Sequence, residues 1–379
     1  MKQTARIIST YTGDTSGVCS ALFELGGLIV MHDPSGCNST YSTHDEPRWY
    51  DMDSLVFISG LTEKDAIFGN DEKIISDTVR AAEELNPRFI AVAGTPIPYM
   101  TGCDFNAIAF EIENRCGIPT FGFETDGMKS YVRGASLAFA EYTRRMCKNT
   151  EKTKDFSVNI LGATPLDFSI NGSVNSIKST IEKNGIRVNS VMAMGSTVEE
   201  IENAASAHVN LVISSCGLDS AKVMYSKFGI PYVIGTPYGN DFTQKIIDSI
   251  TQSTLSGNNI SCFDSKSTEE TIIIGESVTS LSLANALKSN LGLCAKVISA
   301  VDSPKELLSD VCVKATYEDE IIPLIKNAKN IIADPMYKPI CPDNINFIEL
   351  PHEAFSGRIY RKKIPNLVLS LDYITNSLK

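Results

Sequence analysis

The residues best able to do chemistry lie in one segment, residues 13–49. Within it an apolar run, Leu28–Met31, leads directly into the sequence His-Asp-Pro-Ser-Gly-Cys, which ends at Cys37. Pro34 and Gly36 favour a tight turn, so we expect Cys37 in a loop whose backbone N–H groups stabilise a thiolate. Soft thiolates select zinc, copper(I) or iron–sulfur clusters. The alternative, that Cys37 is only a small loop residue, stays open.

Two further cysteines are candidates to join Cys37 in a ligand set. Cys19 lies in a helical run over residues 15–25 that leads into the same strand. Cys103 lies in the loop after an apolar run over residues 89–92 and just before a helix, and helix N-termini favour anionic thiolates. Each of the two also has a purely structural interpretation. Six other cysteines lack a partner at ligand spacing and are expected to be structural: Cys116, Cys147, Cys262, Cys294, Cys312 and Cys341.

Short apolar runs alternate with amphipathic helices along the whole chain, which predicts parallel sheets covered by helices on both faces. In the first third we expect strands over residues 28–31, 55–58, 89–92 and 120–123. A run without apolar side chains, residues 149–155, indicates a linker, and a polar stretch, residues 253–267, separates a third unit. The pattern therefore predicts three Rossmann-like α/β domains with parallel sheets. Their expected bounds are residues 1–150, 151–267 and 268–379.

The composition narrows the classes of function. The chain has 379 residues, of which 43% are hydrophobic and 21% charged, as in ordinary globular proteins. Its net charge of −11 argues against nucleic acid and anionic membranes as partners. No stretch approaches the roughly 18 apolar residues of a membrane span. The N-terminus lacks the pattern of a signal peptide, and the ten cysteines are too sparse for a disulfide framework, so we expect a cytoplasmic protein.

Several common catalytic motifs are absent from the sequence. It contains no complete G-x-G-x-x-G after a strand and no G-x-x-x-x-G-K-[ST], so we expect neither NAD nor a P-loop nucleotide. It also lacks H-E-x-x-H, C-x-x-C and G-x-S-x-G, and it has only four histidines. An α/β chain without these motifs needs another source of chemistry.

Three segments together resemble motifs of the nitrogenase component 1 superfamily. Residues 32–37 resemble its H-G-P-x-G-C motif, and residues 95–104 resemble its C-P-x-x-x-x-G-D-D loop. Residues 210–212 and 227–231 resemble its N-L-V…K-Y-G-I-P stretch. The superfamily includes the catalytic protein of nitrogenase, its cofactor-assembly scaffold and the light-independent protochlorophyllide reductase. The resemblance covers nearly the whole chain and implies the same three-domain fold.

The resemblance implies a dimer, or a dimer of dimers, with an iron–sulfur cluster at the subunit interface. It also implies a separate ATP-hydrolysing iron–sulfur reductase that delivers single electrons to that cluster. Only Cys37 matches a ligand position, because Asp14 and Thr95 stand near the places of the other two cysteines. Asp14, Cys19 or Cys103 could complete the set. In a homodimer two-fold symmetry doubles every ligand, so Cys37 and one more cysteine per chain would hold a [4Fe–4S] cluster.

The family's second site, for a molybdenum–iron cofactor, uses a cysteine directly after N-L-V and a late histidine. Here Ile213 and Ser214 follow that stretch, and Cys216 is displaced by two or three residues. His352 lies in the third domain and could face the interdomain cleft, although its local motif does not match. We therefore expect neither a nitrogenase-type cofactor nor dinitrogen as substrate, and a pocket for an organic molecule stays open.

The leading hypothesis is a nitrogenase-like oxidoreductase subunit. Its interface cluster would relay low-potential electrons from the ATP-dependent reductase to a small substrate in the interdomain cleft. A second hypothesis is a scaffold that assembles or carries a metallocluster without turnover. A third is a metal-free α/β binding protein, because a fold does not fix a function.

Overall fold

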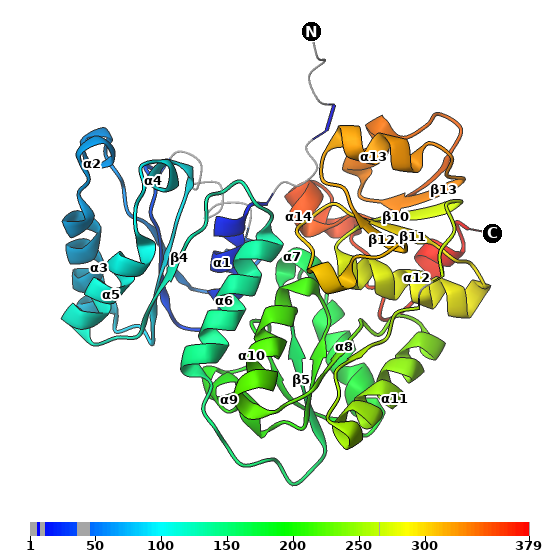
Figure 1. Cartoon of the computed structure of the whole chain (residues 1–379), viewed down its shortest axis with the longest axis horizontal. Coiled ribbons are helices and arrows are strands. Elements are labelled where there is room, and N and C mark those ends of the chain that lie inside the picture. Colours follow the sequence, from blue (N-terminus) through cyan, green and yellow to red (C-terminus); the bar gives the residue numbers. More distant parts are fainter. Residues whose placement is uncertain (1–5, 8–11, 36–45, 265, 379) are drawn as a thin grey trace.

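Three parallel β-sheets follow one another along the chain, and helices cover them (Figure 1). This computed structural model describes residues 6–7, 12–35, 46–264 and 266–378. The strand orders are β2-β1-β3-β4, then β6-β5-β7-β8-β9, then β12-β11-β10-β13-β14. The prediction of an α/β fold with three parallel sheets is confirmed. In each sheet the strand order reverses beside the first strand of the unit, and ligands of such sheets bind at the carboxyl ends of strands near that point.

The first sheet is formed by short apolar strands whose side chains alternate between two helical layers. Leu28 and Val30 of β1 pack with α3 and α5, while Ile29 and Met31 pack with α1 and α6. The strands are β1 (Leu28–Met31), β2 (Leu55–Ile58), β3 (Ile90–Ala93) and β4 (Thr120–Phe123). The helices are α1 (Asp14–Leu22), α2 (Glu63–Phe68), α3 (Asp71–Leu85), α4 (Pro96–Met100), α5 (Phe105–Cys116) and α6 (Tyr131–Met146).

Helices α1 and α6 cross at two glycines. A Cβ added to Gly17 would lie 2.1 Å from the Tyr131 carbonyl oxygen, and one added to Gly134 would lie 1.8 Å from the Asp14 carbonyl oxygen. No larger residue fits this crossing without moving a backbone. The opposite side of α6 packs on α10 of the second unit, so α6 joins the first two units (Figure 1).

The second sheet begins at a fully buried strand, β5. Its strands are β5 (Ser157–Leu161), β6 (Arg187–Val191), β7 (Val209–Val212), β8 (Tyr232–Ile234) and β9 (Ile260–Ser261). Its helices are α7 (Pro165–Phe168), α8 (Ser173–Lys183), α9 (Val198–Glu202), α10 (Leu218–Phe228) and α11 (Asn240–Ser256). The polar stretch over residues 253–267 is therefore not only a separator, because it contains the end of α11 and the edge strand β9.

The third sheet is built around β10, and the chain then returns to the second unit. Its strands are β10 (Thr271–Gly275), β11 (Lys296–Ser299), β12 (Cys312–Lys314), β13 (Asn330–Ala333) and β14 (Asn346–Glu349). Its helices are α12 (Ser277–Leu291), α13 (Glu318–Ile325), α14 (Glu353–Ser356) and α15 (Asp372–Thr375). Leu367, Leu371 and Ile374 pack into one apolar cluster with residues of both units, so the C-terminal segment ties them together. Within the described ranges, no helix has the length and hydropathy needed to cross a membrane.

Candidate functional site

The carboxyl end of β1 is held firmly as far as Ser35. The His32 backbone N–H donates to the Ala93 carbonyl, and its Nδ1 lies 2.8 Å from the Ser59 hydroxyl. Burial lowers the pKa of His32. The Asp33 carboxylate accepts the Ser35 N–H at 2.8 Å, and Ser35 adopts a φ of 93°, which is unusual for a residue other than glycine. Cys37 itself lies outside the described residues.

The two positions that the sequence resemblance matched to cysteine ligands, Asp14 and Thr95, hold side chains that are hydrogen-bonded within the chain. The Asp14 carboxylate accepts backbone N–H groups from Thr15 at 2.9 Å, Asp126 at 3.2 Å and Gly127 at 2.7 Å. Burial raises the pKa of Asp14 to about 6. The Thr95 hydroxyl donates to the His32 carbonyl at 2.7 Å. These hydrogen bonds stabilise the carboxyl end of the first sheet.

The structure places Cys19 and Cys103 on opposite faces of the first sheet. Cys19 lies in α1, is 0% exposed and belongs to the core between the sheet, α1 and α6. Burial raises the pKa of the Cys19 thiol far above its usual value. Cys103 is partly exposed and lines a surface pocket together with His32, which begins the loop toward Cys37. Burial, followed by the charges of Asp71 and Asp104, raises the pKa of the Cys103 thiol to about 12.

Potential metal ligands do not gather within the part of the chain that the structure describes. It contains no group of three or more histidine, cysteine or acidic side chains arranged to hold a metal ion. All nine described cysteines are free thiols.

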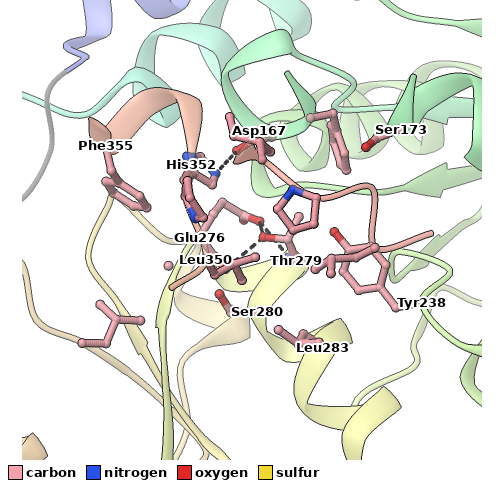
Figure 2. Close-up of a pocket in the computed structure, with 17 residues that line it drawn as sticks. Asp167, Ser173, Tyr238, Glu276, Thr279, Ser280, Leu283, Leu350, His352 and Phe355 are labelled. Atoms are coloured by element: carbon pink, nitrogen blue, oxygen red, sulfur yellow. Dashed lines mark hydrogen bonds and ion pairs between the residues drawn. The ribbon is translucent and has the colours of Figure 1, made fainter. Parts of the chain in front are cut away.

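A second polar site lies between the second and third units, around a cavity of about 60 Å³ (Figure 2). Asp167 and Tyr238 reach it from the second unit, and Glu276, Ser280 and His352 from the third. Apolar side chains complete the lining: Phe168, Ile274, Leu283, Leu350, Phe355, Ile364 and Leu367. His352 thus faces an interdomain cavity, as its place in the sequence suggested.

Asp167 is the centre of the polar network at this cavity. Its side chain is 0% exposed, and it accepts hydrogen bonds from the Tyr131 hydroxyl and, at 3.1 Å, from the Thr164 hydroxyl. The Cys216 Sγ lies 3.5 Å from Asp167 Oδ2, and the His352 Nε2 lies 3.7 Å from Asp167 Oδ1. Cys216, which is displaced from the family position, and His352, whose local motif does not match, therefore both lie next to the Asp167 carboxylate.

Glu276 is fully buried beside this network, and its carboxylate caps α12. It accepts the backbone N–H groups of Val278 at 2.9 Å and Thr279 at 2.8 Å, and that of Ser215 at 3.0 Å. Burial raises the pKa of Glu276, and the charge of Asp167 adds to this.

Sequence reasoning missed Asp167, Tyr131 and Glu276 as members of a site. The one available signal was Glu276, a charged residue placed directly after the buried strand β10. Asp167 follows a Thr-Pro helix start and resembles an ordinary capping residue. Tyr131 resembles an ordinary aromatic residue of an amphipathic helix.

The fold is that of a known class of three-sheet α/β proteins. Two solved structures described as nitrogenase Cp1, one at pH 5 and one at pH 6.5, align over the whole chain with TM-scores of 0.68 and 0.64. In both, the alignment covers 90% of the solved chain at 18% identity, a level that supports likeness of fold alone.

The family model for nitrogenase component 1 type oxidoreductases matches residues 17–281, and the chain belongs to this family. Among curated relatives, the nitrogenase molybdenum-iron protein alpha chain of Clostridium pasteurianum is 28% identical over 54% of this chain and 40% of its own length. The nitrogenase iron-molybdenum cofactor biosynthesis protein NifE of the same organism is 30% identical over 57% of this chain and 47% of its own. The chain thus spans about half the length of the curated relatives it matches.

Proposed function

We propose that the protein is an electron-relay subunit that holds an iron–sulfur cluster between two copies of the chain. The proposal rests on the arrangement of residues at the carboxyl end of the first sheet. There residues 32–35, the described part of the His-Asp-Pro-Ser-Gly-Cys segment, follow β1, and buried hydrogen bonds of Asp14 and Thr95 fix the surrounding backbone. When bound, such a cluster supplies one-electron transfer at a potential set by its ligands and surroundings. An ATP-hydrolysing iron–sulfur reductase is the proposed electron donor.

Cys37 and Cys103 are the proposed ligands from each chain. Cys103 is partly exposed and shares a surface pocket with His32, which begins the loop toward Cys37. Cys19 was an equal candidate from the sequence, but its side chain is enclosed in the core of one chain. Because the raised pKa keeps the Cys103 thiol protonated near neutral pH, iron would have to displace that proton on binding.

The cavity at Asp167 and His352 is the proposed substrate site. It lies between two units, is lined by apolar side chains and presents a few polar groups, as small-molecule sites usually do. The residues around it do not reproduce the family's cysteine-and-histidine pattern for a molybdenum–iron cofactor, so we propose a reducible small molecule in its place. The nine described free cysteines fit the cytoplasmic location that we propose.

The second candidate function is a metallocluster scaffold that performs no turnover. The relatives named NifE favour it, because their printed name is that of a cofactor biosynthesis protein. In this role the chain would bind a cluster and pass it to another protein.

Anaerobic purification of the full chain tests these functions. We expect about four iron and four acid-labile sulfide atoms per two chains, as for one shared [4Fe–4S] cluster. Chemical reduction followed by electron paramagnetic resonance should then show a reducible cluster. A protein free of iron after cluster reconstitution would overturn both functions and leave a metal-free binding protein. Transfer of the intact cluster to an acceptor protein, without oxidation by small molecules, would favour the scaffold.

A further inference from the structure

His352 is held with its ring proton on the side of the cavity. It is the N-cap residue of α14, and its Nδ1 accepts the Ala354 backbone N–H at 3.2 Å. A nitrogen that accepts a hydrogen bond carries no proton, so the proton of the neutral ring lies on Nε2. Asp334 holds the backbone of the same residue, because its carboxylate accepts the His352 backbone N–H at 2.8 Å.

The Nε2–H group is a buried donor without an acceptor. Nε2 is shielded from solvent, and among the described residues it has no hydrogen-bond partner. The nearest carboxylate oxygen, Asp167 Oδ1, lies 3.7 Å away, beyond hydrogen-bond distance, and it already accepts the Tyr131 hydroxyl. Buried donors are nearly always paired, so this N–H group is positioned to bind an acceptor that enters the cavity.

The other polar groups of the cavity include two carboxylates that already accept hydrogen bonds and two hydroxyl groups that make none with described residues. The carboxylates of Asp167 and Glu276 are occupied by donors from the protein. The hydroxyl groups of Tyr238 and Ser280 line the cavity, and no hydrogen bond joins either of them to a described residue. The described part of the chain therefore presents one unpaired N–H donor, on His352, and two hydroxyl groups that can donate or accept. The two buried carboxylates also disfavour an anion in the cavity.

We propose that His352 is a positioning residue whose Nε2–H hydrogen-bonds the acceptor atom of a small neutral ligand, such as a carbonyl oxygen or an imine nitrogen. This inference deepens the proposed function by naming the substrate class of its cavity. The volume of about 60 Å³ is smaller than the ~150 Å³ cavity that admits benzene. The cavity therefore holds a ligand of a few non-hydrogen atoms, or the end of a larger one. Such a hydrogen bond strengthens when its acceptor gains negative charge.

Two matched variants separate this role from the capping role of His352. In His352→Asn the side-chain oxygen replaces Nδ1 as the cap of α14, but no group replaces Nε2. In His352→Gln the amide nitrogen reaches the place of Nε2, but the cap is lost. The Tm should therefore depend on whether the cap of α14 is kept. The ligand affinity should depend on whether the N–H donor at the place of Nε2 is kept.

The test uses the full chain without reductase, labelled with ¹⁵N-histidine, and acetone as the neutral probe. We expect NMR to show the proton on Nε2, and acetone to shift that resonance saturably while acetate, its anionic counterpart, leaves it unmoved. His352→Asn should lose acetone affinity at least tenfold and keep its Tm. His352→Gln should stay within about threefold of the wild type in affinity, with a lower Tm.

Three results would overturn the proposal: a proton on Nδ1, no saturable shift with acetone, or equal acetone affinity in wild type and His352→Asn. Iron is measured on the same samples. Because acetone binding needs neither cluster nor electrons, a protein that lacks iron but binds acetone through His352 sinks the proposed function and leaves this inference standing.

Discussion

Buried polar groups have opposite roles at the carboxyl end of the first sheet and at the cavity around Asp167. At the carboxyl end of the first sheet, Asp14 and Thr95 form hydrogen bonds with backbone groups of their own chain, so these side chains stabilise the local backbone. At the cavity, His352 presents a donor that no described residue accepts. The first region is a structural platform, and the cluster proposed for it needs Cys37 and a second chain. The second region is open to a ligand within one chain.

The largest expected effect concerns the platform. Cys37→Ala should abolish iron binding, because no other residue matches the family's ligand positions. Iron and sulfide analysis of anaerobically purified protein measures this. Cys103→Ala should lose the cluster as well.

Two controls sharpen this prediction. Cys294→Ala, which changes a partly exposed cysteine of the third unit, should keep the full iron content. Cys19→Ala should also keep it, because the Cys19 side chain lies in the core. If iron survives Cys37→Ala, or disappears in Cys19→Ala, the ligand assignment at the first sheet is wrong.

The next largest expected effect is on the pH dependence of the free energy of unfolding, and it tests whether Asp14 has a structural role. Its pKa is raised to about 6 from an ordinary value of 3.8, chiefly by burial. A carboxyl group with a raised pKa in the folded state contributes stability below about pH 4, and this contribution is lost as the pH rises through 6. The wild type should therefore lose about 2 kcal/mol of unfolding free energy relative to Asp14→Asn between pH 4 and pH 7. Urea titrations at each pH measure this difference, and parallel curves for the two proteins would contradict it.

The smallest effect compares two buried tyrosines of α6. Tyr131 donates to the Asp167 carboxylate, whereas the Tyr142 hydroxyl is buried without a hydrogen-bond partner among the described residues. Tyr131→Phe should cost about 2 kcal/mol, because it removes a hydrogen bond to a charged group. Tyr142→Phe should leave stability unchanged within about 0.5 kcal/mol, or raise it. Equal losses in thermal or urea unfolding would show that Asp167 gains nothing from Tyr131.

The sequence was informative where local pattern decides structure. The apolar runs over residues 28–31, 55–58 and 120–123 are strands with the expected bounds. The run expected over residues 89–92 is shifted by one position. The edge strand β9 was missed, because two residues inside a polar stretch carry no periodic signal. The three domain bounds and the ligands Cys37 and Cys103 remain predictions.

By itself the sequence determined three parallel α/β units and the family resemblance, because these depend on hydrophobic periodicity and on residues adjacent in the chain. Only the tertiary structure decided that Cys19 is enclosed while Cys103 is partly exposed, since both follow equally plausible local patterns. It alone brought Tyr131, Asp167 and His352 together from three distant segments. Burial, hydrogen-bond pairing and cavities arise from packing between units, and no local spacing encodes them.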